Sequence, residues 1–426
     1  RRLLLPLLAL VSTTALAQTI AITGGKVVIG DGSAPIDGGT VVIANGRVIA
    51  AGSTVAIPAG AQRIDATGKW VTPGIVAGFS RIGLAGVDGV DESNDTAAKS
   101  SPFSASLDIA LAVNPDVEAI SVNRAAGVTR AVVSPDAGNA IFAGQGAVID
   151  TGADHDPITR ARAFQFVEFG QTGASRAGGS RPAIFATFRN ALAEARDYQL
   201  GRLREDSLLK RADTAALVPV ITGSQKLVVH AESATDILAV LSLKREYPTL
   251  SLVLVGVTEG WRVADRIAAA GVPVIASAVN DLPAAFDQIA ATQSNVGRMK
   301  AAGVTVAIGM IDDDDTRQAM HGAQYAGNLV ALTRVPGATG LSWNDAFAAI
   351  TSKPAQAIGM GSEIGSLQPG RRGDVVIWDG DPLEVTSGVE AVWIDGVRQP
   401  LDTRQTRLRA RYAHPQEGNL PKAYDR

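Results

Sequence analysis

Side chains that bind divalent cations are few in this sequence and fall in a small number of places. The chain has 4 histidines and no cysteine. His230 and Glu232 stand two residues apart, His321 lies nearer the C-terminus, and residues 312–315 are consecutive aspartates. Imidazole and carboxylate are ligand types that zinc and related divalent ions accept. The spacing therefore leaves open an unusual metal site built from His230, His321, Glu232 and this aspartate run.

Other catalytic chemistries have little support. The absence of cysteine excludes disulfides, thiolate nucleophiles and zinc–thiolate sites. No Gly-x-Ser-x-Gly elbow indicates a serine hydrolase. The glycine-rich residues 138–146 are not followed by Lys-Ser or Lys-Thr, so they do not form a phosphate-binding loop, and we interpret them as a structural loop.

The middle of the chain alternates between strand-like and helix-like segments. Short runs rich in Val and Ile indicate strands buried on both faces, and apolar residues at helical spacing separate them. This alternation favours a (β/α)₈ TIM-like barrel, with a doubly wound open sheet as the alternative. The predicted strands include 128–133, 227–230, 250–255, 272–275 and 304–308, and the predicted helices 185–204, 234–244, 260–270, 290–302 and 343–350.

The two ends of the chain have a different pattern. Asn45-Gly46 separates two β-rich runs near the N-terminus, and Asp395-Gly396 follows another near the C-terminus. Both are hairpin signals, because their turn residues must take a positive φ. We therefore expect the ends to form one small β-sandwich domain from residues 18–72 and 356–402. The barrel would then span residues 73–355, and residues 403–426 read as an exposed tail.

The first residues resemble a secretory signal peptide. Arg1 and Arg2 form a basic start, residues 3–11 are apolar, and Ala15-Leu16-Ala17 is a typical cleavage site. We therefore expect residues 1–17 to be removed near Ala17 and the mature protein to be periplasmic or secreted. The apolar run is too short for a membrane span, which needs about 20 residues.

Composition indicates a globular protein with a mild negative charge. Hydrophobic residues make up 46% and charged residues 19% of the chain, which fits a full core rather than disorder. The formal net charge of −3 gives no electrostatic basis for binding nucleic acid or an anionic membrane.

Residues 70–81 read Trp-Val-Thr-Pro-Gly-Ile-Val-Ala-Gly-Phe-Ser-Arg. This segment resembles the first-strand signature of the amidohydrolase superfamily, in particular of its imidazolonepropionase-like, periplasmic-type members. That signature is Thr-Pro-Gly, two aliphatic residues, Asp, a small residue, then His-x-His. Further similarity lies in residues 22–32, 127–149, 365–370 and 373–383.

The resemblance implies a barrel with a metal centre at the carboxyl ends of its strands and a β-sandwich built from both termini. It also implies hydrolysis of non-peptide C–N bonds. In such chemistry the metal activates water and polarises the scissile carbonyl, and an Asp after the last strand transfers the proton. The implied cofactor is zinc or another divalent metal.

Most positions that the resemblance assigns to the metal site carry other residues. The first-strand Asp corresponds to Ala77, and the two histidines correspond to Phe79 and Arg81. Residues 160–200 contain no lysine to bridge two metals. Gly256 stands at the sixth-strand histidine position. His230 matches the fifth-strand histidine and is the lone clear ligand position that survives.

The catalytic Asp has only an approximate counterpart. Ile311 is the nearest match, and Asp312 follows one residue later. Arg81, Glu232 and His321 are the remaining candidates for binding a ligand at the barrel mouth. Arg81 would put a fixed positive charge in the metal's space or bind an anion, and Glu232 is one candidate for its ion-pair partner. His230 also has a plainer interpretation, as a histidine hydrogen-bonded to a neighbour.

Three functions follow from these residues. The first is a pseudoenzyme that lacks the metal site and binds no cofactor, with a small molecule at its barrel mouth or an active homologue as partner. The second is an active mononuclear amidohydrolase with a shifted site. The third is a structural or assembly subunit, as a homo-oligomer or beside an active homologue, with an extended apolar surface.

Overall fold

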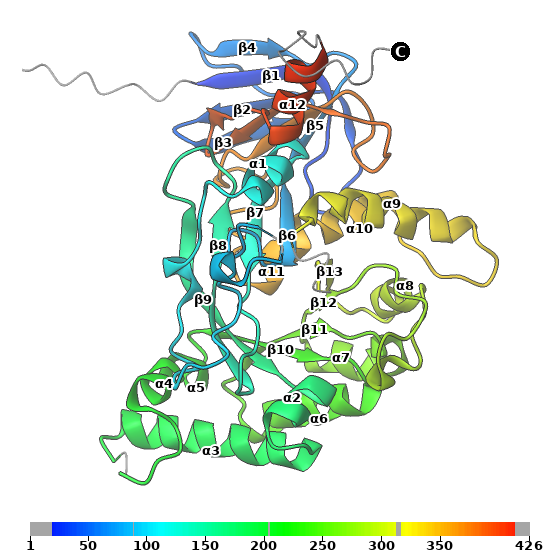
Figure 1. Cartoon of the computed structure of the whole chain (residues 1–426). Coiled ribbons are helices and arrows are strands. Elements are labelled where there is room, and N and C mark those ends of the chain that lie inside the picture. The colour runs from blue at the N-terminus through cyan, green and yellow to red at the C-terminus, as the bar shows by residue number, and fades with distance from the viewer. Residues whose placement is uncertain (1–18, 88, 203–204, 312–316, 414–426) are drawn as a thin grey trace, which may run out of the picture.

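Two sheets organise the molecule, and the chain passes from the first into the second and back again (Figure 1). The structure is a computed structural model that describes residues 19–87, 89–202, 205–311 and 317–413. The predicted signal peptide and Asp312 lie outside these described residues. In Figure 1 the sheet formed by the chain ends lies at one end of the molecule and helix α3 (Arg181–Gln199) at the other.

The first sheet combines strands from both termini, which confirms the prediction. Its order is β16-β15-β14-β5-β1-β2-β3, with β4 paired to β1. Asn45 and Gly46 have φ of 52° and 73°, and Asp395 and Gly396 have φ of 49° and 75°. Both dipeptides therefore form the tight hairpin turns expected of them. The strands are β1 (Ile20–Val27), β2 (Ile36–Ala44), β3 (Arg47–Gly52), β4 (Gln62–Asp65), β5 (Trp70–Pro73), β14 (Val375–Trp378), β15 (Val389–Ile394) and β16 (Val397–Arg398).

The second sheet curls into a nearly closed barrel, in agreement with the predicted TIM-like fold. Its order is β13-β12-β11-β10-β9-β8-β7-β6. The ends of the sheet approach each other, because a Cβ added to Gly78 of β6 would lie 2.4 Å from the carbonyl oxygen of Ile308 in β13. The strands are β6 (Ile75–Ser80), β7 (Val128–Val133), β8 (Phe142–Asp150), β9 (Ile158–Glu168), β10 (Lys226–Ala231), β11 (Ser251–Gly256), β12 (Val274–Ala276) and β13 (Val306–Ile308).

One strand of the barrel runs against the others. β8 pairs antiparallel with both β7 and β9, whereas the other neighbouring pairs are parallel. The interpretation of residues 138–146 as a loop was therefore wrong for residues 142–146, since Phe142 begins a nine-residue strand. Every residue of β8 is buried. The glycines of this segment thus serve close packing, as at Gly146, where an added Cβ would lie 2.0 Å from the Phe164 ring.

Helices cover the outside of the barrel, and two of the predicted ones are shorter than expected. The helix predicted for residues 290–302 begins only at Asn295, because the Ala290 amide donates to the Glu259 carboxylate instead. The segment 260–270 divides into a 3₁₀ turn and a helix.

The helices are α1 (Glu118–Ala125), α2 (Gly170–Arg176), α3, α4 (Arg211–Ala216), α5 (Val218–Ile221), α6 (Ala234–Glu246), α7 (Ala264–Ala270), α8 (Asn295–Ala301), α9 (Gly322–Ala331), α10 (Trp343–Ala349), α11 (Ser352–Ala357) and α12 (Arg404–Ala413). The 3₁₀ turns are η1 (Asp91–Ser93), η2 (Ile109–Leu111), η3 (Gly260–Arg262), η4 (Phe286–Gln288), η5 (Ala319–His321) and η6 (Leu332–Arg334).

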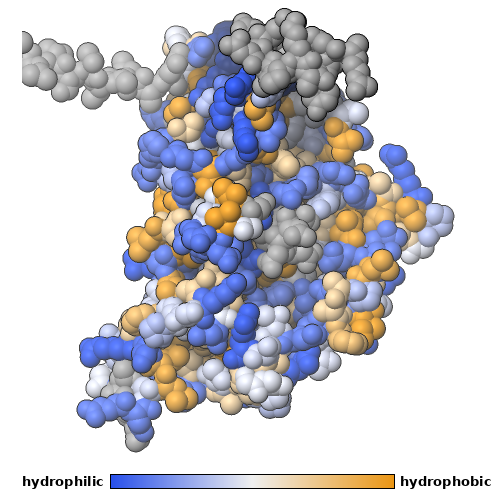
Figure 2. Space-filling view, viewed as in Figure 1, coloured by the Kyte–Doolittle hydropathy of each residue, from blue (hydrophilic) through white to orange (hydrophobic). Residues whose placement is uncertain are grey.

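The surface is mixed in character. On the face shown in Figure 2, hydrophobic residues are interspersed among hydrophilic ones. Within the described residues, no helix combines the length and the apolarity needed to cross a bilayer. The α12 helix lies in the predicted exposed tail, and none of its side chains is buried.

A buried charge cluster fastens the barrel to the terminal sheet. Arg130 of β7 is fully buried, and its Nε lies 2.7 Å from Asp374 Oδ2. Its Nη2 lies 2.8 Å from Asp395 Oδ2, and its Nη1 donates to Thr159 Oγ1 at 2.6 Å. These contacts join two barrel strands to the segment around β14 and β15, so the two sheets pack as one unit through Arg130.

Candidate functional site at the barrel mouth

The place of the first-strand histidine is filled by a packed aromatic ring. Phe79 of β6 is 2% exposed and its ring centroid lies 5.5 Å from that of Phe166 in β9. Gly309, just after β13, makes room for it, because an added Cβ would be 2.8 Å from Phe79 Cβ. The ring belongs to the apolar core inside the barrel, together with Val228 and Ile275. Phe79 therefore seals the barrel interior at a position where the family places an imidazole ligand.

Arg81 follows β6 and is also buried, and Asp136 is one of its ion-pair partners. Its Nη2 lies 3.1 Å from Asp136 Oδ1, and the side chains are 8% and 35% exposed. Glu232, which was one candidate for this pairing, is hydrogen-bonded to His230. Asp136 is held near the mouth because its own amide donates to the Thr96 carbonyl. Arg81 thus carries its charge in an ion pair formed close to its own strand.

His230 lies between two carboxylates near the carboxyl end of β10. Its Nδ1 is 2.8 Å from Glu168 Oε2, and its Nε2 is 2.8 Å from Glu232 Oε1. The exposed fractions are 20% for the His230 side chain, 5% for Glu168 and 7% for Glu232. Strand register explains the first contact, since His230 pairs with Glu168 of the neighbouring strand β9. We name these three residues the His230 cluster.

The carboxylates favour the protonated imidazolium. Burial opposes its charge, but the charges and hydrogen bonds of Glu168 and Glu232 outweigh burial and raise the pKa of His230 well above its usual value. Burial also opposes ionisation of Glu232, yet the hydrogen bond from His230, with that from Thr258, lowers the pKa of this carboxyl. The His230 cluster is therefore a charged, mutually compensated group with one edge reached by solvent.

Gly256 makes the His230 cluster possible. This residue ends β11 with a φ of +88°, and an added Cβ would lie 2.4 Å from Glu232 Oε1 and 2.8 Å from His230 Cδ2. The other oxygen of Glu232 accepts from the Thr258 amide at 2.9 Å. Val257, which lies between Gly256 and Thr258 in the chain, has a φ of 58°, a strained value for a β-branched residue. The Glu232 carboxylate thus occupies the space beside β11 that a sixth-strand side chain would need.

The described donors do not fit a metal centre. A ligand imidazole must present a nitrogen lone pair to the ion, but both nitrogens of His230 face carboxylates that already engage them. Among residues 19–413 other than the gaps given above, no group of three or more His, Asp or Glu side chains could hold a metal ion. The space of the first pair is filled by Phe79 and by the cation Arg81, which would repel a metal.

His321 lies in a turn directly before α9, and among the described residues it joins no group of three or more possible metal ligands. His321 ends η5, a turn tied to α1 because Asn123 Oδ1 accepts from the Met320 amide at 2.7 Å. Its ring centroid lies 6.2 Å from that of Tyr325 in α9. The predicted sites Arg81, His230 and Glu232 all lie at the ends of barrel strands or just beyond them, whereas Asp312 lies outside the described residues.

Sequence reasoning missed Glu168 and Asp136. The resemblance directed attention to a lysine in residues 160–200, so a carboxylate at the end of β9 was not considered. Its signal was nonetheless present, because Glu168 follows the strand-like run Phe164-Gln165-Phe166-Val167 and stands two residues before Gly170. A charged residue at the carboxyl end of a barrel strand is a typical site residue.

Comparisons with known proteins agree with this architecture. The model of the Amidohydrolase family matches residues 260–398. Amidohydrolase tasK of Hapsidospora irregularis is 24% identical over 384 residues, 80% of this chain and 38% of that protein. Imidazolonepropionase of Maricaulis maris is 29% identical over 229 residues, 52% of this chain and 50% of that protein. The chain thus spans about half or less of the length of these curated relatives.

Solved structures show the same fold. An amidohydrolase from Thermotoga maritima superposes with a TM-score of 0.79 at 23% identity, covering 89% of this chain and 99% of the other. Molinate hydrolase gives a TM-score of 0.55 at 19% identity, covering 95% and 99%. Together with the family model and the curated relatives, the barrel and terminal sheet lead to one conclusion: this chain is similar to the amidohydrolase superfamily in fold and, over residues 260–398, matches its family model.

Proposed function

We propose that this protein is a pseudoenzyme of the amidohydrolase superfamily, in which the barrel mouth binds a ligand and does not hydrolyse it with a metal. The observation that carries the proposal is the arrangement of Gly256, Glu232 and His230. The surviving ligand position is locked between two carboxylates, and one of them fills the space of the missing sixth-strand ligand. Phe79 and Arg81 support it by filling the place of the first-strand pair.

The chemistry left at the mouth is recognition by fixed charges. Both nitrogens of the imidazolium of His230 are engaged by carboxylates, and the Arg81 guanidinium is paired with Asp136. A small polar ligand would therefore be bound by the exposed edges of these pairs, of which Asp136 is the most accessible. No bound water is activated and no scissile bond is polarised in this proposal.

A second candidate is a working hydrolase of non-peptide C–N bonds, the activity class that the names of the relatives suggest. It is favoured by the partial exposure of His230 and by the position of Asp312 next to the barrel mouth in sequence. This candidate requires zinc or another divalent ion held by a set of ligands that includes residues outside the described part of the chain.

The proposal places the mature protein in the periplasm or outside the cell, after cleavage near Ala17. The sequence of residues 1–17 supports this placement. A homo-oligomer or an active homologue of the same family remains the proposed protein partner.

The deciding experiment is the metal content of the purified mature protein, measured by elemental mass spectrometry after incubation with zinc and manganese and then desalting. We expect well under one metal per ten chains and no change in thermal midpoint on adding a chelator. About one metal per chain, lost in His230→Ala and retained in the matched control His155→Ala, would contradict the pseudoenzyme proposal. It would support the hydrolase, which cyclic amides and dipeptides would then test.

A further inference from the structure

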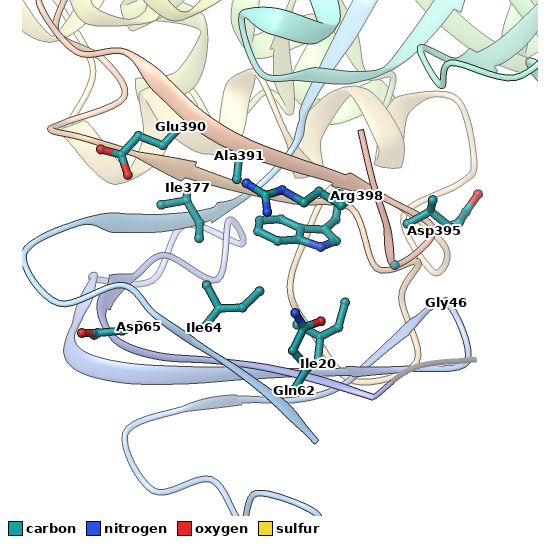
Figure 3. A pocket seen from close by; sticks show the side chains of 13 residues that line it. Ile20, Gly46, Gln62, Ile64, Asp65, Ile377, Glu390, Ala391, Asp395 and Arg398 are labelled. Atoms are coloured by element: carbon teal, nitrogen blue, oxygen red, sulfur yellow. The ribbon is translucent and has the colours of Figure 1, made fainter. Parts of the chain in front are cut away.

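A groove of about 440 Å³ opens in the terminal sheet, between strand β4 and strands β15 and β16, far from the barrel mouth in the fold. Figure 3 shows its two walls, with Gln62, Ile64 and Asp65 on one side and Glu390, Ala391 and Arg398 on the other. Its volume lies within the range of about 300–1,000 Å³ typical of ligand sites. No role at the barrel mouth explains this groove, because every lining residue belongs to the terminal sheet or its turns.

The floor of the groove is apolar. Ile20, Ile64 and Ile377 line it together with Ala391 and Trp393. Trp393 is 2% exposed and belongs to the core of this domain. Such a floor accepts aliphatic side chains, since removing apolar surface from water is favourable.

One wall is the outer edge of strand β4. Among the described residues β4 pairs only with β1, in parallel. The Gln62 amide donates to Thr19 and the Ala66 amide to Thr23, so these alternate residues face β1. In a parallel ladder the intervening residues direct their backbone groups to the opposite side. The N–H and C=O groups of Arg63 and Asp65 therefore point away from β1, along the outer edge of β4, and Asp65 also lines the groove.

The other wall is only partly covered by a strand. β16 pairs with β15 at Trp393 and Ile394, and the Gln399 amide donates to the Val392 carbonyl at 2.8 Å, so the printed backbone bonds on the outer side of β15 reach no further than Val392. An open strand edge beside an apolar floor is a template for pairing with another chain. Extended peptides exploit such edges, because main-chain hydrogen bonds supply affinity while alternate side chains enter the pockets.

The charges around the groove select the kind of peptide. The Asp65 carboxylate is exposed and is oriented by hydrogen bonds from the Thr67 amide and hydroxyl at 2.9 and 2.6 Å. In Figure 3 it lies at the same end as Glu390, whose charge is compensated by Lys69. Arg398 covers the Trp393 ring at 5.8 Å. The end near Asp65 is thus suited to a basic side chain.

We propose that this groove binds an extended peptide of a partner protein, which pairs with the outer edge of β4. The peptide has aliphatic residues at alternate positions, which face Ile64, Ile377 and Trp393, and a basic residue near Asp65. This inference is independent of the function proposed for the barrel mouth.

The probe is a fluorescein-labelled peptide with an N-terminal lysine followed by Val-Thr repeats, titrated with the full chain and followed by fluorescence anisotropy. We expect saturable binding with a Kd in the micromolar range. The same peptide with N-methyl groups on alternate backbone nitrogens should bind at least tenfold more weakly, because it cannot complete the ladder. Equal binding of both peptides, or no saturation up to millimolar protein, overturns the proposal.

A matched pair of variants locates the edge. Arg63→Pro removes an N–H on the outer edge of β4 and leaves the bonds from β4 to β1 in place, as is tolerated on an edge strand. It should weaken the peptide at least tenfold, while Arg63→Ala, which keeps that N–H, should change binding less than twofold. The N-methylated probe tests the same contact in the wild-type chain if Arg63→Pro does not fold.

Two other occupants are distinguishable in the same assay. If removing residues 414–426 raises peptide affinity tenfold, the groove belongs to the chain's own C-terminal end, and the partner proposal fails. If light scattering shows a dimer that the peptide dissociates, the occupant is a second copy, which also overturns it.

Discussion

Two buried clusters hold a cation among carboxylates, and they serve different ends of the barrel. Arg130, on the side of the terminal sheet, is fully buried and is bonded to Asp374, Asp395 and Thr159. His230, at the mouth, is 20% exposed and is held by Glu168 and Glu232. Arginine stays charged at any physiological pH, whereas histidine changes charge near neutrality. The comparison indicates a permanent joint at one end and a group able to respond to solvent at the other.

Removing the joint should have the largest effect. Arg130→Met leaves the buried carboxylate of Asp374 without its cation and removes one of the two cations that contact Asp395, so we expect the free energy of unfolding to fall by about 3–5 kcal/mol. Urea denaturation followed by circular dichroism measures this loss. Arg372→Gln is the control, because Arg372 is 26% exposed and contacts only Asp395 of this group; it should cost less than about 1 kcal/mol. Equal losses would show that Arg130 has no special role in joining the sheets.

Breaking the His230 cluster should have a smaller and pH-dependent effect. His230→Gln leaves the carboxylates of Glu168 and Glu232 without the cation between them. We therefore expect the free energy of unfolding to fall by about 3 kcal/mol at pH 7. The pKa of His230 is raised in the folded protein, so its contribution is complete below the unfolded pKa near 6.5 and is lost as pH rises through the folded pKa.

The test is urea denaturation of wild type and His230→Gln at pH 7 and at increasing alkaline pH. The difference between the two proteins should shrink as the pH rises above 7. His155→Gln is the control, since the His155 side chain is 82% exposed, and it should match wild type throughout. A constant difference across this range would contradict the charged state assigned to His230.

Restoring a side chain at the sixth-strand position tests how tightly the mouth is filled. Gly256→Ala places a Cβ 2.4 Å from Glu232 Oε1 at a φ of +88°. We therefore expect the free energy of unfolding to fall by about 2 kcal/mol. In a Glu232→Ala background the loss should fall by about half, because only the backbone strain and the contact with His230 remain. Thermal unfolding of the four proteins of this double-mutant cycle measures the coupling; strict additivity would contradict the filled-site interpretation.

The smallest expected effect belongs to Asp150, which lies beside Arg130. Burial raises the pKa of Asp150 to about 6, although Arg130 favours its ionised form. The folded pKa exceeds the unfolded value of 3.8. As the pH rises from about 4 to about 6, ionisation of this group therefore lowers the free energy of unfolding, and the loss remains at higher pH.

Asp150→Asn should therefore raise the free energy of unfolding by about 1 kcal/mol at pH 8 and have no stabilising effect at pH 4. Asn retains an oxygen that accepts from the Gly152 amide, as Asp150 does at 2.8 Å. Destabilisation at pH 8 would show instead that the pair with Arg130 outweighs the cost of burying the carboxylate.

The sequence alone determined the class of fold and showed which of the family's metal-ligand positions carry other residues. Strands rich in Val and Ile, alternating with helical segments, specify a barrel because parallel strands are buried on both faces. Asn45-Gly46 and Asp395-Gly396 specified the hairpins, since few residues other than Gly, Asn and Asp tolerate a positive φ. Phe79, Arg81 and Gly256 at the ligand positions showed from residue type alone that the usual donors are missing.

Only the tertiary structure decided which charges meet. Glu168 is 62 residues from His230 along the chain, and their contact depends on the register of β9 against β10. The pairing of Arg81 with Asp136 and the space taken by Glu232 beside Gly256 depend in the same way on how strand ends converge. Local propensity specifies which residues form strands, but it carries no information on pairing between distant segments. That pairing is set by packing of the whole core, and it turned the one surviving ligand position into the centre of an ion-pair cluster.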